Sequence, residues 1–370
     1  MSPATIPATS RAVVVEAFGS PVQVKDVPIP DALEPGALLV RVEACSVCGT
    51  DLHLWQGELS LGVDLPVILG HEMVGRIVQV GAGAERDSLN QELSVGDRII
   101  WTHTACGSCK FCLLGQVTLC VNRLGYMFQT CAEPPYLLGG FSEYVYVLPD
   151  SGRVRVPDQV SSDLASIASC ALRSVMKAFR EVGSLSSSEH VLIQGSGPLG
   201  LLATAVSVAA GVRSVTVIGG PSDRLELAKR FGATNVLDVT ATSTAERAER
   251  IAGWTEGYGP DVTFEFSGNP NAFAEGLALT SKGGRYMVVG QLGKGEVAVA
   301  PSMITAKNLA VMGSFSGGVR DYWDALRFFE RFQDDFPFTD LITNTYTLET
   351  VNDALTSMKA EREIKPLITF

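Results

Sequence analysis

Four cysteines lie within a stretch of fifteen residues: Cys106, Cys109, Cys112 and Cys120. Four thiolates on one short loop suit a closed tetrahedral zinc site, which has no open coordination position for chemistry. Gly107 and Gly115 allow the tight turns that such a loop needs. The alternatives are paired disulfides, which a reducing compartment disfavours, an iron–sulfur cluster, and a DNA-binding zinc ribbon. Lys110 is the only basic residue within the loop, which counts against the ribbon. The loop predicts a structural zinc ion.

Further metal-ligating residue types are spread along the chain. Cys48 precedes Thr50, Asp51 and His53, and the sequence Gly70-His71-Glu72 follows about twenty residues later. Cys48 and His71 can supply two ligands, and Cys170 can supply a third from a distant segment. Three protein ligands leave a fourth position for water or a substrate oxygen, as a catalytic zinc requires. An isolated cysteine is more often a small core residue, so this hypothesis depends on the combination with the four-cysteine loop.

A glycine-rich turn predicts a dinucleotide site. The sequence Gly195-Ser196-Gly197-Pro198-Leu199-Gly200 follows the apolar segment 191–194 and opens a helical pattern. In this motif the first glycine makes the turn, the second lets a pyrophosphate approach the backbone, and the third allows close packing of helix on strand. The helix N-terminus then offers unpaired N–H groups to the phosphates.

The residues after the next strand bear on the choice between NAD(H) and NADP(H). NAD-binding chains usually carry an acidic residue there to hold the ribose hydroxyls, but Gly219 occupies this position, followed by Gly220. The missing carboxylate removes repulsion of a 2′-phosphate, and Ser222 and Arg224 could help to bind one. These residues favour NADP(H) slightly.

The pattern of apolar residues predicts two kinds of architecture. Residues up to about 150 contain short valine-rich and isoleucine-rich strands separated by Gly, Pro and Asp turns. From about residue 160, strands alternate with helices, and one of these helices has Ser222 as its expected N-cap. The expected fold is therefore α/β, a doubly wound parallel sheet of the Rossmann type with a β-rich domain. The expected strands of the second region are 191–194, 215–218, 235–237, 261–266, 285–290 and 309–312, and the expected later elements are helices 321–332 and 349–360 and a final strand 366–370.

Composition excludes several classes of partner. The 370-residue chain is 46% hydrophobic and 19% charged, with a net charge of −11, so it is globular and lacks the basic surface that nucleic acids or anionic membranes need. No run of 18 uninterrupted apolar residues predicts a membrane span, and residues 1–10 lack the features of a secretion signal. We therefore expect a cytoplasmic protein.

These landmarks together resemble the zinc-containing medium-chain dehydrogenase/reductase family, over nearly the full chain from Arg11 to Phe370. They occur in the order that the family shows, and seven landmarks in order are more specific than any one alone. The landmarks are Cys48-Gly49-Thr50-Asp51-Leu52-His53, Gly70-His71-Glu72, Val95-Gly96-Asp97-Arg98, the four-cysteine loop, Cys170, the glycine-rich turn at 195–200, and Ser267-Gly268.

The resemblance implies a domain plan and a role for each site residue. It implies a GroES-like catalytic domain at 1–156 and 316–370, with a zinc lobe at about 104–122, and a Rossmann dinucleotide-binding domain at 157–315. Cys48, His71 and Cys170 would ligate a catalytic zinc in addition to the structural one, giving two zinc ions per chain. The remaining implied roles are a hydrogen bond to the substrate hydroxyl from Thr50, proton relay by His53, support of the metal site by Asp51 and Glu72, and cofactor contacts by Ser267 and Lys365.

The implied activity is that of an alcohol dehydrogenase that converts an alcohol, expected to be secondary, to a ketone or aldehyde, or the reverse, with NAD(P). A zinc-free quinone or enoyl reductase of the same fold and a non-enzymatic zinc-binding protein are the alternatives. The substrate stays open among cyclic, aliphatic and phosphonate alcohols, with Arg123 and Arg173 as the candidate contacts for a phosphonate. Family members form homodimers or homotetramers, and the strand at 286–289 is a candidate for such an interface.

Overall fold

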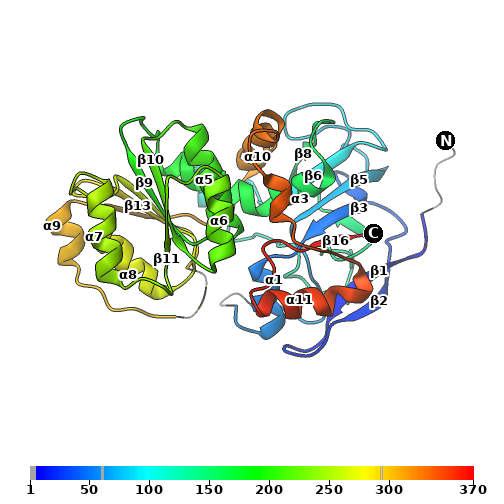
Figure 1. The fold of residues 1–370 in the computed structure, drawn as a ribbon. Helices are drawn as coiled ribbons and strands as arrows, with labels where there is room; N and C mark the ends of the chain where they lie inside the picture. Colours follow the sequence, from blue (N-terminus) through cyan, green and yellow to red (C-terminus); the bar gives the residue numbers. More distant parts are fainter. Residues whose placement is uncertain (1–5, 60–61, 292, 294) are drawn as a thin grey trace. The chain divides into compact units, whose positions relative to one another are not determined.

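The computed structural model describes residues 6–59, 62–291, 293 and 295–370 (Figure 1). Residues 1–5, part of the segment for which the sequence predicted no secretion signal, lie outside this part. The chain divides into two compact units. Unit 1 comprises residues 1–173, 317–333 and 338–370, and unit 2 comprises residues 174–316 and 334–337.

Unit 1 is built on two mainly antiparallel sheets. A three-stranded sheet has the order β2-β1-β4, and a seven-stranded sheet has the order β15-β16-β3-β5-β6-β8, with β7 paired to β3. The long strand β3 pairs with β5, β7 and β16, so it lies at the centre of the larger sheet. The strands are β1 Thr9–Val15, β2 Gln23–Pro28, β3 Leu38–Ser46, β4 Val67–Ile68, β5 Met73–Val80, β6 Arg98–Thr104, β7 Tyr144–Val147, β8 Ser151–Arg155, β15 Thr345–Tyr346 and β16 Leu367–Thr369.

Short helices connect and flank these strands. Those that bear on the site are α1 (Gly49–Gln56), the short α3 (Ser162–Ile167) and the π-helical turn η2 (Ala168–Leu172). The others are α2 Lys110–Leu113, η1 Val117–Leu119, α10 Val319–Phe332, η3 Phe338–Leu341, η4 Leu348–Thr350 and α11 Val351–Lys359.

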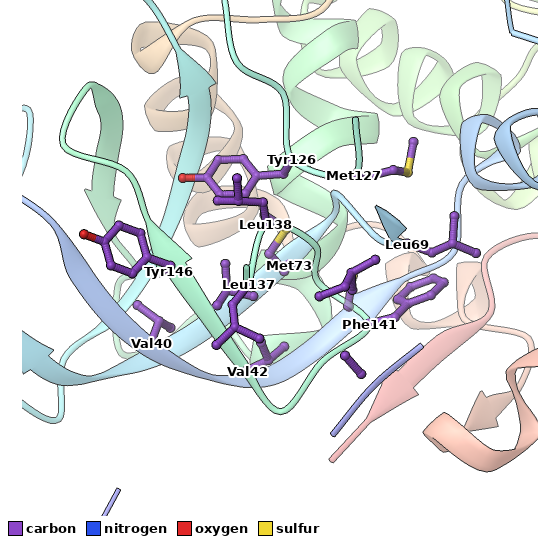
Figure 2. Packing of buried hydrophobic residues seen from close by; sticks show 14 of the residues in the cluster. Val40, Val42, Leu69, Met73, Tyr126, Met127, Leu137, Leu138, Phe141 and Tyr146 are labelled. Carbon is purple, nitrogen blue, oxygen red and sulfur yellow. The ribbon is translucent and has the colours of Figure 1, made fainter. Parts of the chain in front are cut away.

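The core of unit 1 lies between its strands and the loop that precedes β7. Figure 2 shows the side chains of β3 and β5 packed against aromatic residues of this loop. Val40, Met73, Tyr126 and Phe141 are each at most 2% exposed. Burial of β-branched and aromatic side chains on a pleated surface is what strands of this composition favour. This core fixes the ends of β3 and β5, where the candidate metal ligands lie.

Unit 2 is a six-stranded parallel sheet with helices between its strands. Its order is β11-β10-β9-β12-β13-β14, which is the 3-2-1-4-5-6 order of a doubly wound dinucleotide-binding fold. The predicted α/β fold class is therefore confirmed. The elements are α4 Arg173–Val182, whose first residue belongs to unit 1, β9 His190–Gln194, α5 Pro198–Ala209, β10 Ser214–Gly219, α6 Ser222–Arg230, β11 Asn235–Asp238, α7 Thr244–Trp254, β12 Val262–Glu265, α8 Pro270–Leu279, β13 Arg285–Val288, α9 Ser302–Lys307 and β14 Ala310–Gly313.

Two helix starts differ from the sequence-based expectations, and the strand proposed as an interface has defined neighbours. Ser222 is the first residue of α6 and Pro221 is its N-cap, because the turn after β10 is one residue shorter than expected. The expected helix 349–360 begins with the 3-10 turn η4, and α11 starts only at Val351. The strand at 285–288 lies between β12 and β14, so both of its edges are already paired within the sheet.

Within the described residues, no helix combines the length and the apolar character needed to cross a bilayer.

Candidate metal centres and cofactor site

Unit 1 brings four potential ligands together from three separate segments. Cys48, His71, Glu72 and Cys170 each have a ligand atom within 4.8 Å of those of the other three. Cys48 is the N-cap of α1, His71 and Glu72 immediately precede β5, and Cys170 lies in η2. The sequence analysis predicted three of these as ligands and placed Glu72 beside them.

Asp51 ties two of these segments together. Its carboxylate accepts a hydrogen bond from the Cys48 amide at 2.7 Å and another from the Gly70 amide at 2.9 Å. Gly70 has a positive φ of 91°, and a Cβ there would lie 2.6 Å from the ring of Phe141. A residue with a side chain would therefore displace the segment that carries His71.

Two serines hold the other side of the cluster. The Ser166 hydroxyl donates to the Glu72 carbonyl oxygen at 2.6 Å and accepts from the Ser46 amide at 2.7 Å. Ser166 lies in α3, two residues before the π-helical η2, which contains Cys170. A π-helical turn inserts one extra residue into a helix and is frequent at functional sites.

Electrostatics within the cluster favour the thiolate form at only one of its two cysteines. The pKa of the Cys48 thiol is raised, first because it donates to Cys170 and second because it is buried. The same hydrogen bond lowers the pKa of Cys170. Burial lowers the pKa of His71, but the combined interactions with Asp51, whose Oδ1 is 3.7 Å from Nδ1, and with Cys48 outweigh burial and raise it to about 10.

Glu72 has a buried cationic partner. Its Oε2 lies 2.5 Å from the Nζ of Lys365 and accepts from the Ser46 hydroxyl at 2.6 Å. Burial raises the pKa of Glu72 to about 7, while the charge of Lys365 opposes this shift. Lys365 is only 1% exposed. The ammonium group of Lys365, a residue expected to contact the cofactor, is buried against Glu72, because β16 pairs with the end of β3.

Thr50 and His53 lie on α1, next to the cluster in sequence. The Thr50 Oγ1 is 3.6 Å from the Cys48 Sγ. His53 is exposed, and its Nδ1 lies 3.1 Å from the carboxylate of Glu58. Thr50 is therefore beside the ligands, whereas His53 is in contact with solvent.

The cluster fits a zinc ion by its donor set. Two thiols and an imidazole are typical ligands of zinc. Glu72 Oε1 and His71 Nδ1 are buried and have no hydrogen-bond partner within the described residues. A buried carboxylate oxygen without a partner is costly, and a nearby cation would offset this cost.

The four cysteines of the loop 106–120 also form one cluster, with every Sγ within 4.8 Å of the others. Gly107 and Gly115 have positive φ values of 67° and 75°, so both turns use the conformational freedom of glycine. The Sγ atoms of Cys109 and Cys112 are 3.5 Å apart, and none of the eight cysteines, which all lie in the described part of the chain, forms a disulfide. A disulfide requires about 2.05 Å between sulfurs, so the paired-disulfide alternative does not hold.

The glycine-rich turn in unit 2 has the close backbone contacts that its motif requires. Gly195 has a φ of 113°, and a Cβ on Gly200 would lie 1.9 Å from the Gly195 carbonyl oxygen. Pro198 is the first residue of α5, Leu199 follows it, and Gly197 is the N-cap. No atom lies within 4 Å of a Cβ built on Gly197, which leaves its backbone open to a ligand. The turn therefore fits a pyrophosphate at the N-terminus of α5.

Two further features lie next to the glycine-rich turn, at the carboxyl ends of the strands. Ser267 packs against the turn, since a Cβ on Gly195 would lie 2.9 Å from the Ser267 amide nitrogen. Ser267 and Gly268 both donate their amides to the buried carboxylate of Glu265, at 2.7 and 2.8 Å. Arg224 lies in the first turns of α6, three residues after Pro221.

Sequence reasoning missed the residues that support the site from other segments. Ser46, Ser166 and Glu265 carry no motif, and nothing in their sequence context connects Ser166 with Glu72. The pairing of Lys365 with Glu72 was missed because the two residues lie at opposite ends of unit 1 in sequence. A buried charge is rare without a partner, so pairing buried charges of opposite sign is the one signal that could have suggested this contact.

Comparison with known proteins agrees with this geometry. Residues 34–158 match the alcohol dehydrogenase GroES-like domain, and residues 198–331 match the zinc-binding dehydrogenase domain. The chain is 32% identical over 349 residues to 5-exo-hydroxycamphor dehydrogenase of Pseudomonas putida, covering 94% of this chain and 95% of the relative. It is 30% identical over 350 residues to L-threonine 3-dehydrogenase of Shewanella sp. (strain ANA-3), covering 93% and 95%.

Two solved structures share the whole fold. An alcohol dehydrogenase of Thermotoga maritima superposes with a TM-score of 0.91 at 31% identity, covering 98% of this chain and 99% of that one. A zinc-binding dehydrogenase of Sinorhizobium meliloti 1021, bound to NADP, gives 0.85 at 29% identity and covers 98% and 100%. This chain therefore belongs to the zinc-containing medium-chain dehydrogenase/reductase family, as its motifs predicted.

Proposed function

We propose that this protein is a zinc-dependent alcohol dehydrogenase that interconverts a secondary alcohol and a ketone with NADP(H) or NAD(H). The observation that carries the proposal is the convergence of Cys48, His71 and Cys170 beside a carboxylate oxygen without a hydrogen-bond partner. This is a ligand set with room for one more oxygen, which is what separates a catalytic zinc site from a structural one.

Each site residue of unit 1 has a defined task in the proposed reaction. Cys48, His71 and Cys170 would hold the zinc ion, which when bound supplies a Lewis acid that lowers the pKa of an alcohol. Asp51 holds the His71 segment and the start of α1 in place. The Thr50 hydroxyl accepts a hydrogen bond from the substrate hydroxyl. His53 is exposed, and it exchanges the proton that the substrate loses with solvent. Lys365 pairs with Glu72 beside the ligands.

A second zinc ion is proposed at the four-cysteine loop, giving two per chain. Four sulfurs leave no coordination position for a reactant, so this ion would stabilise the loop and take no part in chemistry. The presence of both clusters argues against a zinc-free quinone or enoyl reductase. The dinucleotide turn argues against a zinc-binding protein without enzymatic activity.

For the cofactor, we propose a small preference for NADP(H) over NAD(H). Gly219, the last residue of β10, carries no carboxylate to repel a 2′-phosphate, and Arg224 is the third residue of α6, the helix that follows β10. The similar dehydrogenase of Sinorhizobium meliloti 1021 is bound to NADP.

The domain plan and assembly follow the same proposal. Unit 1 (residues 1–173, 317–333 and 338–370) would be the catalytic domain and unit 2 (174–316 and 334–337) the dinucleotide-binding domain, in place of the bounds 1–156 with 316–370 and 157–315 that the sequence suggested. We further propose a homodimer or homotetramer. Strand β14 is one of the two edge strands of the parallel sheet of unit 2, and among the described residues it pairs with β13 alone. A paired edge protects a sheet from uncontrolled association, so β14 is a better interface candidate than the interior strand at 285–288.

The substrate class is proposed from the relatives as a secondary alcohol. Hydroxycamphor, which gives one relative its name, is a cyclic secondary alcohol. The two candidate contacts for a phosphonate have other roles in unit 1: Arg173 is buried with its guanidinium 5.3 Å from the ring centre of Tyr322, and Arg123 donates to the Thr118 carbonyl oxygen at 3.3 Å. Cyclic and aliphatic secondary alcohols are therefore the first substrates to test.

The experiment combines metal analysis with turnover. Protein purified without chelators should contain two zinc ions per chain and should increase the absorbance of reduced nicotinamide when given secondary alcohols with NADP+ or NAD+. The panel should include cyclic, aliphatic and phosphonate alcohols, with L-threonine as a zwitterionic member. One zinc ion per chain together with no turnover of any alcohol would refute the proposed function.

A further inference from the structure

We propose that Asp238 sets the choice between NAD(H) and NADP(H), by presenting a carboxylate to the adenosine ribose from the strand next to the usual one. The inference rests on the proposed function, because it takes the glycine-rich turn as the pyrophosphate site. It adds a specificity-determining residue at a position where the sequence motif places none.

The usual position for an acidic residue is sterically closed in this chain. A Cβ on Gly219, the last residue of β10, would lie 2.3 Å from the Ser196 Oγ and 2.8 Å from the Ser196 backbone nitrogen. The Ser196 hydroxyl is held there by the amide and the carbonyl oxygen of Gly220, at 2.9 and 3.0 Å. Real Cβ atoms do not approach a backbone atom this closely, so an aspartate at 219 would displace the phosphate-binding turn.

Asp238 lies directly beside this closed position. Strands β10 and β11 are parallel, and Gly219 is in register with Asp238. The amide of Val239 donates to the Gly219 carbonyl oxygen at 2.9 Å, which continues the pairing to the ends of both strands. The Asp238 Oδ1 is 3.8 Å from the position of a Cβ on Gly220. A carboxylate therefore stands at the carboxyl edge of the sheet, where ligands of open α/β folds bind.

The orientation of this carboxylate is fixed by its own loop. Its Oδ1 accepts from the Thr240 amide at 2.8 Å, the Thr240 hydroxyl at 2.7 Å and the Ala241 amide at 3.3 Å. These hydrogen bonds lower the pKa of Asp238, the hydroxyl of Thr240 contributing most, so the group is ionised at neutral pH. Within the described residues Oδ2 has no hydrogen bond, and it is available as an acceptor.

The chemistry of the ribose decides the sign of the effect. In NAD(H) the 2′-hydroxyl can donate a hydrogen bond to a carboxylate, whereas in NADP(H) the 2′-phosphate is an anion that a carboxylate repels. The neighbouring charges at this edge are Arg224, which attracts a phosphate, and Asp223, whose Oδ1 accepts from the Arg224 amide. Arg224 and the lack of a carboxylate at Gly219 both favour NADP(H), and the charge of Asp238 opposes them. Asp238 therefore keeps the preference for NADP(H) small.

The test is the Asp238→Asn variant, which keeps an acceptor for Thr240 and removes the charge. We expect the ratio of kcat/KM for NADP+ to kcat/KM for NAD+ to rise about tenfold over that of the unchanged protein, as for removal of one like charge near a partly exposed anion. Titration of the dinucleotides without alcohol, followed by protein fluorescence, should show a lower Kd for NADP+ and a higher Kd for NAD+. An unchanged ratio and unchanged Kd values would overturn the proposal.

A matched control is Glu256→Gln. Glu256 pairs with Arg213, which immediately precedes β10 and therefore lies at the amino end of that strand, whereas Asp238 lies at the carboxyl end of β11. The substitution removes one negative charge from unit 2 at this opposite end of the strands. The control should leave the ratio within about twofold, and an equal rise in both variants would also overturn the proposal, since it would show a general charge effect. If Asp238→Asn melts at a lower temperature, Asp238→Ser replaces it, because a serine hydroxyl can accept from the same amides.

These outcomes separate the two proposals. If the unsubstituted protein turns over alcohol with either nicotinamide, but Asp238→Asn leaves the ratio of the two kcat/KM values unchanged, only the role of Asp238 is contradicted. A protein that binds neither dinucleotide contradicts the proposed function, and the role of Asp238 with it.

Discussion

The two cysteine-containing clusters of unit 1 use similar ligands in contrasting surroundings. His71 is 6% exposed and Glu72 is fully buried, and hydrogen bonds from three separate segments support them. In the loop 106–120 only Cys120 is buried among the four cysteines, and the neighbouring Leu113 and Leu114 are 74% and 63% exposed.

This difference indicates how far the structure of each cluster depends on its proposed metal ion. The first cluster is held by the folded protein, whose core and buried hydrogen bonds would keep the ligands close with or without metal. The second is a short loop with little buried apolar surface, so that metal–sulfur bonds must supply most of its stability. Removing a ligand should therefore abolish chemistry in the first cluster and unfold a segment in the second.

The largest expected effect is that of Cys48→Ser. Loss of one ligand should reduce zinc from two ions per chain to one and lower kcat/KM by at least about a thousandfold, because a Lewis acid contributes several kcal/mol to the transition state. The melting temperature should stay within about 3 °C, since the fold holds this cluster. Cys131→Ser, which changes a thiol outside both clusters, is the control and should keep both ions. Full turnover in Cys48→Ser would contradict the site.

The next largest effect concerns the ion pair beneath the first cluster. Lys365→Met leaves the buried carboxylate of Glu72 without its cation, which should cost about 3–5 kcal/mol of unfolding free energy. Urea unfolding followed by circular dichroism measures this loss. The exposed pair of Lys25 with Glu16 provides the control, and Lys25→Met should cost less than about 1 kcal/mol. Equal losses in both variants would show that burial of the Glu72 pair is unimportant.

A local effect is expected from Cys112→Ser. The loop should lose its zinc ion and open, so that trypsin cleaves after Lys110, the exposed basic residue within it. The unfolding free energy of the rest of unit 1 should fall by no more than about 2 kcal/mol, because its core lies elsewhere. Mass spectrometry of the fragments identifies the site of cleavage. If the loop 106–120 resists trypsin without zinc, its stability does not depend on the metal, and the proposed difference between the two clusters is contradicted.

The smallest effect is that of Ser108→Ala. The Ser108 hydroxyl and the Asn122 amide group donate to the Cys106 sulfur at 3.6 and 3.4 Å. These hydrogen bonds lower the pKa of Cys106 to about 5, with the Ser108 hydroxyl first among the causes. Without this donor the thiolate should be less stable, and the affinity of the loop for zinc should fall about tenfold. Competition with a chromogenic chelator measures this, and an unchanged affinity would exclude the hydroxyl as a support of the thiolate.

The sequence by itself determined the features whose residues are close together along the chain. The four-cysteine loop and the glycine-rich turn are local, so their spacing alone predicts which atoms can meet. The alternation of strands and helices after residue 160 predicted the parallel sheet, because strand and helix have different hydrophobic periods. Element ends were less well predicted, as the N-cap at Pro221 shows, because capping depends on the turn that precedes it.

Only the tertiary structure decided the contacts between distant segments. Cys170 reaches His71 across 99 residues, with 3.4 Å between Sγ and Nε2, and Lys365 reaches Glu72 from the last strand. The closure of position 219 by Ser196 and the placement of Asp238 beside it depend on the register of β9, β10 and β11. Such contacts arise from how strands pair and helices pack, and residue spacing within one segment contains no information about that pairing.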